Sequence, residues 1–180
     1  TVPSYEDEFD KRADIYNYDL SLKNHLEEML ERDQAYRTQW ILSRQLHHEE
    51  TQDDIALRLR ADSIDSLNQV EIRQILKEHG FPKKTEVGTS ACEAAWIIIQ
   101  HAPLDVQKEY LPMLERAATE GNIQAALVAA LHDRIDVREG RPQKYGTQRN
   151  HNGICPLLNK KMVNQWRKEV GLPPLDEYSK

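Results

Sequence analysis

The sequence contains few cysteines and no long apolar run. Its 180 residues include two cysteines, Cys92 and Cys155, which allow at most one disulfide bond and so exclude a disulfide-bonded scaffold. The longest apolar run covers residues 94–99, whereas a membrane-spanning helix needs about 18 apolar residues or more. With 39% apolar and 30% charged residues, the chain is polar for a globular protein but not polar enough to be disordered throughout.

Standard catalytic motifs are also missing. The chain has no GxGxxG, GxxxxGKS/T, GxSxG or HExxH segment. His47 and His48 precede two glutamates, but adjacent side chains on a helix do not face one side, so we interpret this segment as solvated surface. A metal site made of His101, His132 and Asp133 is an alternative that sequence separation neither supports nor excludes. We predict no metal and no cofactor.

The charge is unevenly distributed. The formal net charge is −6, and residues 1–60 carry 14 acidic and 8 basic side chains. The stretch 134–168 instead holds 9 basic and 2 acidic side chains. The chain as a whole is acidic and this stretch lacks interleaved exposed aromatics, so we predict no nucleic-acid binding. The basic stretch could bind an anionic partner. The candidates are a polar or anionic small molecule, a peptide-like ligand and the acidic N-terminal segment itself. No particular protein partner is indicated.

The start of the sequence bears on localisation. The first residue is Thr1 rather than Met, and no hydrophobic signal core follows it. A soluble protein with this start is cytoplasmic, or exported if a leader was removed before Thr1. We leave these two alternatives open.

Apolar residues recur mostly at helical spacing, which predicts a mainly α fold. We expect an acidic arm over residues 1–18 and one compact domain over 19–180, with about six helices and one small β-hairpin. Residues 47–60 either extend the first helix or form a charged connection. Leu67, Val70, Ile75 and Leu76 are expected to form the buried side of the second helix. The first of the six helices, with Asp19 or Ser21 as its N-cap, is expected to end near residue 46. The others are expected at 66–79, 89–101, 104–120, 123–134 and 159–170, and the hairpin strands at 135–137 and 143–147.

Two short polar clusters interrupt these helices. Asp33 and Arg37 are spaced for an ion pair on one helix face, an arrangement that is also common on solvated surfaces. Gln100 and His101 lie at the C-terminal end of the most apolar helix, where a histidine can act as a general acid or base. The alternative is a histidine that caps the last carbonyls of its helix.

A third cluster is the densest. Asp133 and Arg134 end an alanine-rich helix and lead into the expected hairpin, where buried charges need partners. The donors and acceptors that follow suit the recognition of a polar small molecule, or else a hydrogen-bonded corner that fixes the hairpin to the helices. They are Gln143, Tyr145, Thr147 and Gln148.

These motifs together resemble a bacterial family of unknown function, the domain-of-unknown-function family numbered 6624. The resemblance covers about residues 22–178, and its most specific segment is Pro142-Gln143-x-Tyr145-Gly146-Thr147-Gln148. Further matching positions are Asp33-Gln34-x-x-Arg37, Asn68, Gly80-Phe81-Pro82, Gly88, Gln100-His101-Ala102, Gln107, Asp133-Arg134, Val163-Asn164-x-x-Arg167 and Gly171-Leu172-x-Pro174-Leu175. The family name implies no reaction, but its signature positions coincide with the polar clusters.

Our hypothesis is a polar pocket between the third helix, the end of the fifth helix and the hairpin. His101 would be the general acid or base of a metal-independent hydrolase or group-transfer enzyme. Asp133 would orient His101 or anchor Arg134, and Arg134 would bind an anionic or carbonyl group. The alternative is a non-enzymatic binding or interaction module, in which the same residues form a structural hydrogen-bond network. The substrate-binding candidates are Asp33, Arg37, Gln100, Gln143, Tyr145, Thr147 and Gln148.

Overall fold

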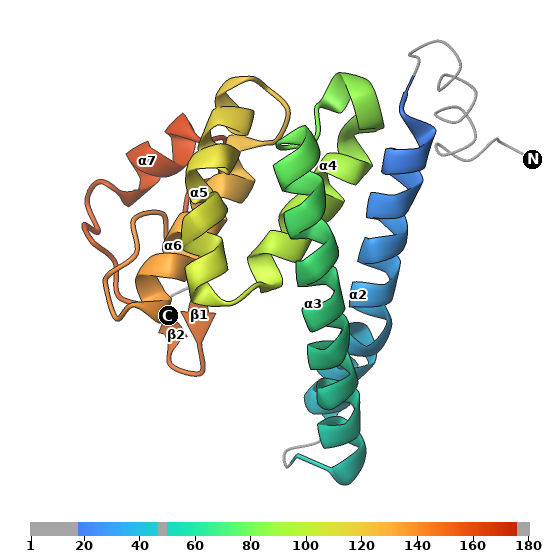
Figure 1. Cartoon of the computed structure of the whole chain (residues 1–180). Coiled ribbons are helices and arrows are strands. Elements are labelled where there is room, and N and C mark those ends of the chain that lie inside the picture. The colour runs from blue at the N-terminus through green and yellow to red at the C-terminus, as the bar shows by residue number, and fades with distance from the viewer. Residues whose placement is uncertain (1–17, 47–49, 176–180) are drawn as a thin grey trace, which may run out of the picture. The chain divides into compact units, whose positions relative to one another are not determined.

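The fold is mainly helical, as predicted. The structure, a computed structural model, describes residues 18–46 and 50–175, and these residues form six helices and one two-stranded sheet (Figure 1). The chain divides into two compact units, residues 1–101 and 102–180, which are described separately. The expected single domain over 19–180 stays a prediction, and residues 1–17 of the expected arm lie outside the described residues. None of the helices in the described ranges is long and apolar enough to cross a membrane.

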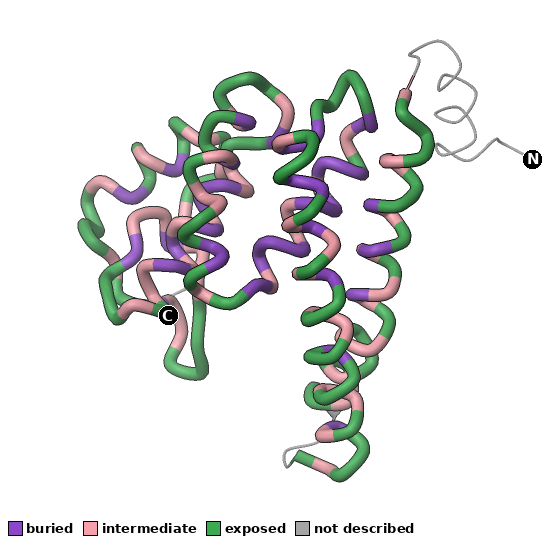
Figure 2. Tube along the Cα trace, viewed as in Figure 1, coloured by how far each residue is buried: buried purple, intermediate pink, exposed green. Residues whose placement is uncertain are grey.

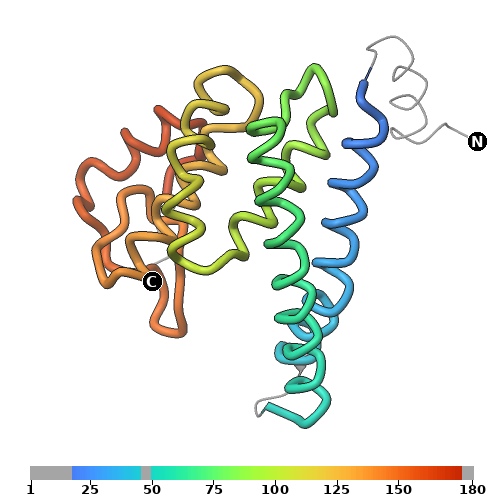
Figure 3. Tube along the Cα trace, in the orientation of Figure 1, coloured from blue at the N-terminus to red at the C-terminus, as the bar shows by residue number. Residues whose placement is uncertain are grey.

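The first unit is built from three helices that pack on one another. They are α2 (Leu20–Leu46), α3 (Gln52–His79) and α4 (Lys84–His101). The path of the chain shows α2 and α3 running in opposite directions (Figure 3). Of the two expected N-cap residues, Asp19 caps α2, because its carboxylate accepts the backbone N–H of Leu22 at 3.0 Å. Buried residues are frequent along α4 (Figure 2), and the core of the unit includes Leu26, Met29, Ile72, Leu76, Ala95 and Ile98.

Helix α3 begins much earlier than the predicted start at residue 66. Its first turn is fixed by a capping box, in which the Thr51 hydroxyl accepts the Asp54 backbone N–H and the Asp54 carboxylate accepts the Thr51 backbone N–H. Residues 52–60 therefore belong to the second helix, neither extending the first helix nor forming a loose connection. Residues 47–49, with His47 and His48, lie outside the described residues.

The predicted buried side of α3 was partly wrong. Ile75 and Leu76 are buried, but Leu67 and Val70 are 57% and 69% exposed. The inward face instead runs through Ala61, Asn68 and Ile72. Because the asparagine on this face is polar, the apolar pattern alone placed the face incorrectly.

Helix α4 is interrupted at Gly88. Gly88 has φ +80° and ψ 171°, a conformation that separates a short first turn from the long apolar part of the helix. The part after Gly88 matches the predicted helix over 89–101. The turn that starts at Lys84 was not expected.

The second unit contains three further helices and the small sheet. Its elements are α5 (Leu104–Thr119), α6 (Ala125–Arg138), β1 (Arg149–Asn150), β2 (Gly153–Ile154) and α7 (Val163–Glu169). Helices α5 and α6 pack together. The buried residues between and around them include Val106, Leu114, Ala117, Val128 and Leu131.

The predicted hairpin was misplaced. Residues 135–137 continue α6, which ends at Arg138, so their short alternation was part of a helix. The observed hairpin pairs β1 with β2 in antiparallel register, and Gln143 forms a separate bridge with Leu157. The last helix is also shorter than predicted, since α7 starts at Val163 after a turn in which the Asn159 carboxamide accepts the Lys161 backbone N–H.

Candidate functional site

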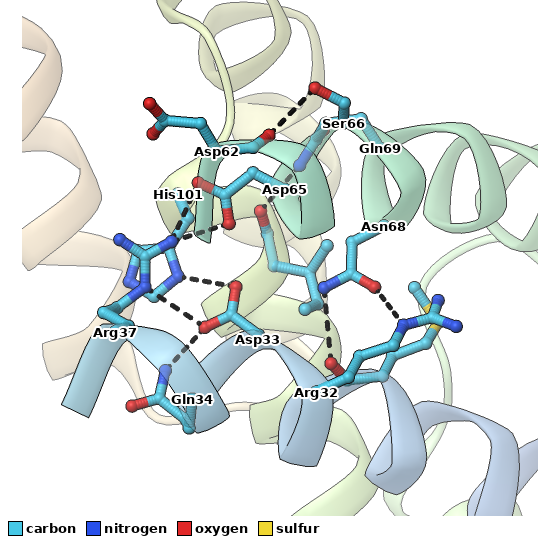
Figure 4. A network of polar contacts seen from close by, with 12 residues as sticks. Arg32, Asp33, Gln34, Arg37, Asp62, Asp65, Ser66, Asn68, Gln69 and His101 are labelled. Atoms are coloured by element: carbon cyan, nitrogen blue, oxygen red, sulfur yellow. Dashed lines mark hydrogen bonds and ion pairs between the residues drawn. The ribbon is translucent and has the colours of Figure 1, made fainter. Parts of the chain in front are cut away.

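The first unit holds His101 against a buried carboxylate. The imidazole Nδ1 lies 3.0 Å from Oδ1 of Asp33, which is on α2, and His101 itself is the last residue of α4 (Figure 4). The Asp33 side chain is 1% exposed, whereas that of His101 is 17% exposed. The two helices thus bring together residues that lie 68 positions apart in the chain.

Arg37 joins this pair to a second carboxylate. Its Nη2 donates to both oxygens of Asp65 on α3, at 2.6 and 2.8 Å, and its Nε lies 3.4 Å from Oδ2 of Asp33. The predicted ion pair of Asp33 and Arg37 is therefore confirmed. Asp65 was not singled out from the sequence, because no spacing rule relates it to a partner 28 positions away.

The environment of Asp33 favours its ionised form. Burial raises the pKa of this carboxyl group, but the hydrogen bond from His101 and the charges of His101 and Arg37 lower it by more. The Gln34 amide adds a hydrogen bond to Oδ2 at 2.6 Å. The net pKa of Asp33 lies below its ordinary value, so it is a carboxylate at neutral pH.

Asp65 shifts in the opposite direction. Burial raises its pKa, and the nearby charge of Asp33 adds to that effect. The hydrogen bond and charge of Arg37 oppose the shift without cancelling it, and the net pKa lies above the ordinary value. The two carboxyl groups are therefore unequal, with Asp33 the stronger acid.

The contact with Asp33 determines which nitrogen of His101 can react. A carboxylate only accepts hydrogen bonds, so the proton of a neutral imidazole lies on Nδ1 and points at Asp33. Nε2 then carries the free lone pair. Among residues 18–46 and 50–175 no partner for Nε2 is observed. This arrangement prepares Nε2 to accept a proton, which is what a general base requires.

Among the residues that the structure describes, three members of this cluster are grouped closely enough to hold a metal ion. Asp33, Asp65 and His101 each offer one ligand atom, and these atoms lie within 4.8 Å of one another. However, Arg37 already places a cation against both carboxylates. A metal ion would have to displace this guanidinium. The sequence offered a second possible metal set, made of His101, His132 and Asp133. In the structure, Nε2 of His132 lies 2.7 Å from a carboxylate oxygen of Glu115, which does not belong to that set.

Further polar contacts extend along α2 and α3. Nε of Arg32 donates to the carbonyl oxygen of the buried Asn68 side chain at 2.6 Å, and Nη2 of Arg32 pairs with Glu71 at 2.6 Å. The Asn68 amide in turn donates to the Met29 carbonyl at 3.3 Å. These bonds explain why an asparagine occupies the inward face of α3.

In the second unit, Asp133 fixes the loop that follows α6. Its buried carboxylate accepts the backbone N–H groups of Lys144, Tyr145 and Thr147, and the Thr147 hydroxyl, at 2.9 Å each. Both oxygens are thus used within the unit. The predicted site residues around Asp133 are therefore brought together, in the form of a hydrogen-bonded corner.

Gln143 fixes the other side of this loop. Its side chain is fully buried, and its amide nitrogen donates to the carbonyls of Gln148 and Cys155 at 2.9 Å. Its amide oxygen accepts the Gln148 backbone N–H at 2.8 Å. The Gln148 side chain donates to the Ala130 carbonyl at 3.3 Å and so ties the loop to α6.

The remaining predicted residues occupy varied positions. Tyr145 and Arg134 are half-buried, and the carbonyl of Tyr145 accepts a bond from Arg167 at 2.7 Å. Gln100 is buried. The expected pocket draws on both units, and the roles expected for Asp133 and Arg134 in it stay predictions. Within the first unit, the carboxylate that orients His101 is that of Asp33.

The fold and site define a mainly helical protein with a buried carboxylate–histidine–arginine cluster. The model of a family of unknown function, DUF6624, matches residues 20–180, and the chain belongs to this family. The resemblance noted in the sequence is thereby confirmed. Comparisons with curated proteins and with solved structures gave no match.

Proposed function

We propose that this protein is an enzyme that catalyses hydrolysis or group transfer on a polar small molecule or peptide-like substrate, with His101 as its general acid and base. The observation that carries the proposal is the 3.0 Å contact between Nδ1 of His101 and the buried Asp33 carboxylate. This contact fixes the imidazole tautomer and leaves Nε2 available on a side chain that is 17% exposed.

The chemistry follows from these positions. In hydrolysis, Nε2 removes a proton from water as the water oxygen bonds to the carbonyl carbon of the substrate. The protonated imidazole is stabilised by Asp33 and returns this proton to the leaving group as its bond to carbon breaks. In group transfer, an alcohol or amine takes the place of water. Asp33 is a positioning residue in this scheme.

The proposal is tested by the reactivity of His101 with diethyl pyrocarbonate, which acylates unprotonated imidazole. We expect His101 to react at least as fast as His79, although their side chains are 17% and 52% exposed. Asp33→Asn should slow this reaction. His101→Asn should lower turnover of carboxylic esters or amides by about 10² or more and leave the melting temperature within a few degrees.

His132 supplies a matched control. It also pairs with a carboxylate, but through Nε2 and at a site where both side chains are well exposed. His132→Asn should leave turnover unchanged. The proposal is wrong if His101 reacts more slowly than His79, or if His101→Asn retains full turnover.

A second candidate function is a non-enzymatic binding or interaction module. The observation that favours it is the hydrogen-bonded loop around Asp133. There, the carboxylate of a residue that matches the family pattern accepts backbone N–H groups of its own unit. If the cluster around His101 is equally structural, His101→Asn will unfold the first unit. His101 will then also be unreactive towards diethyl pyrocarbonate in the folded protein.

A further inference from the structure

We propose that the pair of carboxylates beside His101 selects substrates whose reacting group carries no negative charge, with Asp65 as the specificity-determining residue. The inference rests on the proposed catalytic role of His101. The class it names includes carboxylic esters and amides. It excludes phosphate esters, in which the reacting group is an anion.

The bonding of Arg37 is the first reason. Arginine commonly binds anionic substrates through two parallel N–H groups. Here, Nη2 of Arg37 donates to both oxygens of Asp65, and Nε is turned towards Asp33 (Figure 4). Of the three guanidinium nitrogens of Arg37, only Nη1 has no bonded partner in the described ranges. Arg37 therefore has no pair of unbonded nitrogens with which to clamp an anion.

The net charge of the cluster is the second reason to expect that anionic groups are excluded. When His101 is a neutral base, Asp33 and Asp65 carry two negative charges and Arg37 carries one positive charge. The cluster is thus net negative, and both carboxylates lie within 4.8 Å of the His101 ligand atom. An anion held about 4 Å from such a charge loses about tenfold or more in affinity when the site is partly shielded from water.

Two further arginines of α2 and α3 are held by acidic side chains. Arg32 pairs with Glu71 on α3 at 2.6 Å, and Arg58 lies 3.7 Å from Glu50 and 3.8 Å from the exposed Asp62. Each of these two arginines has at least one acidic partner of its own, so neither offsets the net negative charge beside His101.

The test measures the binding of inorganic phosphate, read from the NMR signals of the His101 imidazole. The His101→Asn variant assigns these signals by removing them. Asp65→Asn removes one negative charge and leaves Nη2 of Arg37 with a single neutral acceptor, so we expect it to bind phosphate at least about tenfold more tightly than the unaltered chain. The overturning result is equal affinity in the two proteins.

Asp62→Asn is the matched control. It removes the same charge from the same helix, one turn before Asp65, at a side chain that is 61% exposed. We expect its phosphate affinity to stay within about twofold of the unaltered chain, because solvent screens this charge. A gain equal to that of Asp65→Asn would show a general charge effect and would contradict the assignment to Asp65.

The unaltered chain gives an independent answer if Asp65→Asn does not fold. At constant ionic strength and pH 7, ethylammonium should perturb the His101 signals at lower concentration than phosphate does. The reverse order overturns the inference. If the expected order holds but His101 is inert towards diethyl pyrocarbonate, the catalytic proposal alone is wrong.

Discussion

Asp33 is the residue on which the first unit's polar cluster depends. It is 1% exposed, yet it accepts bonds from His101 and Gln34 and contacts Arg37. A buried carboxylate is tolerable only with partners of this kind, because an unpaired charge in the interior is strongly destabilising. The same contacts that orient His101 therefore also stabilise the fold.

This dual role predicts a pH-dependent effect of Asp33→Asn. The pKa of Asp33 in the folded chain lies below its ordinary value of 3.8, so its stabilisation is present above pH 3.8 and is lost as the pH falls through the folded pKa. At pH 7, Asp33→Asn should lower the free energy of unfolding by about 3 kcal/mol. Urea titrations at pH 7 and pH 3 should show the difference shrinking at the lower pH.

Glu28→Gln is the control for this experiment, because Glu28 is an exposed carboxylate on the same helix. It should change the stability little at either pH. A destabilisation by Asp33→Asn that is equally large at both pH values would mean that side-chain shape, and not the charge of Asp33, stabilises the cluster.

Among the elements, those with long apolar periodicity could be predicted from the sequence. Helix α2 ends at Leu46, where its end was predicted, and starts directly after Asp19, one of the two expected N-cap residues. The start of α3 was missed because residues 52–60 are highly charged and their helical state depends on the Thr51 capping box. The strand assignment failed at residues 135–137, because three alternating residues fit a helix turn equally well.

The candidate site could be predicted only in part, because local spacing reveals contacts within one helix but not contacts between helices. The ion pair of Asp33 and Arg37 follows from helical spacing, and His101 stands out at the end of an apolar helix. The contacts with Asp65 and between Asp33 and His101 depend on how three helices pack. Sequence spacing carries no information about such pairings.

The capping box makes a prediction for α3. Thr51→Ala removes the hydroxyl that accepts the Asp54 backbone N–H, and should lower the free energy of unfolding by about 1 kcal/mol. Thr51→Ser keeps this acceptor and should be close to neutral. Urea denaturation of the two variants measures the difference. Equal stabilities would show that the charged first turns of α3 fold without the cap.

At the scale of the whole molecule, the two units differ in charge as well as in structure. Residues 1–101 carry a net charge of −8, and residues 102–180 carry +2. Each unit contains its own polar network, built around Asp33 in the first and around Asp133 in the second. The acidic character of the chain is therefore a property of the unit that holds His101.

Separate networks predict that damage to one unit stays local. Asp133→Ala leaves four backbone or hydroxyl donors without their acceptor and should destabilise the second unit by about 3 kcal/mol. Hydrogen exchange followed by mass spectrometry should then speed up in peptides from residues 102–175 and stay unchanged in α2 and α3. Asp33→Asn should produce the opposite pattern, with faster exchange confined to residues 18–101. Faster exchange throughout the chain in either variant would show that both units unfold in a single cooperative step.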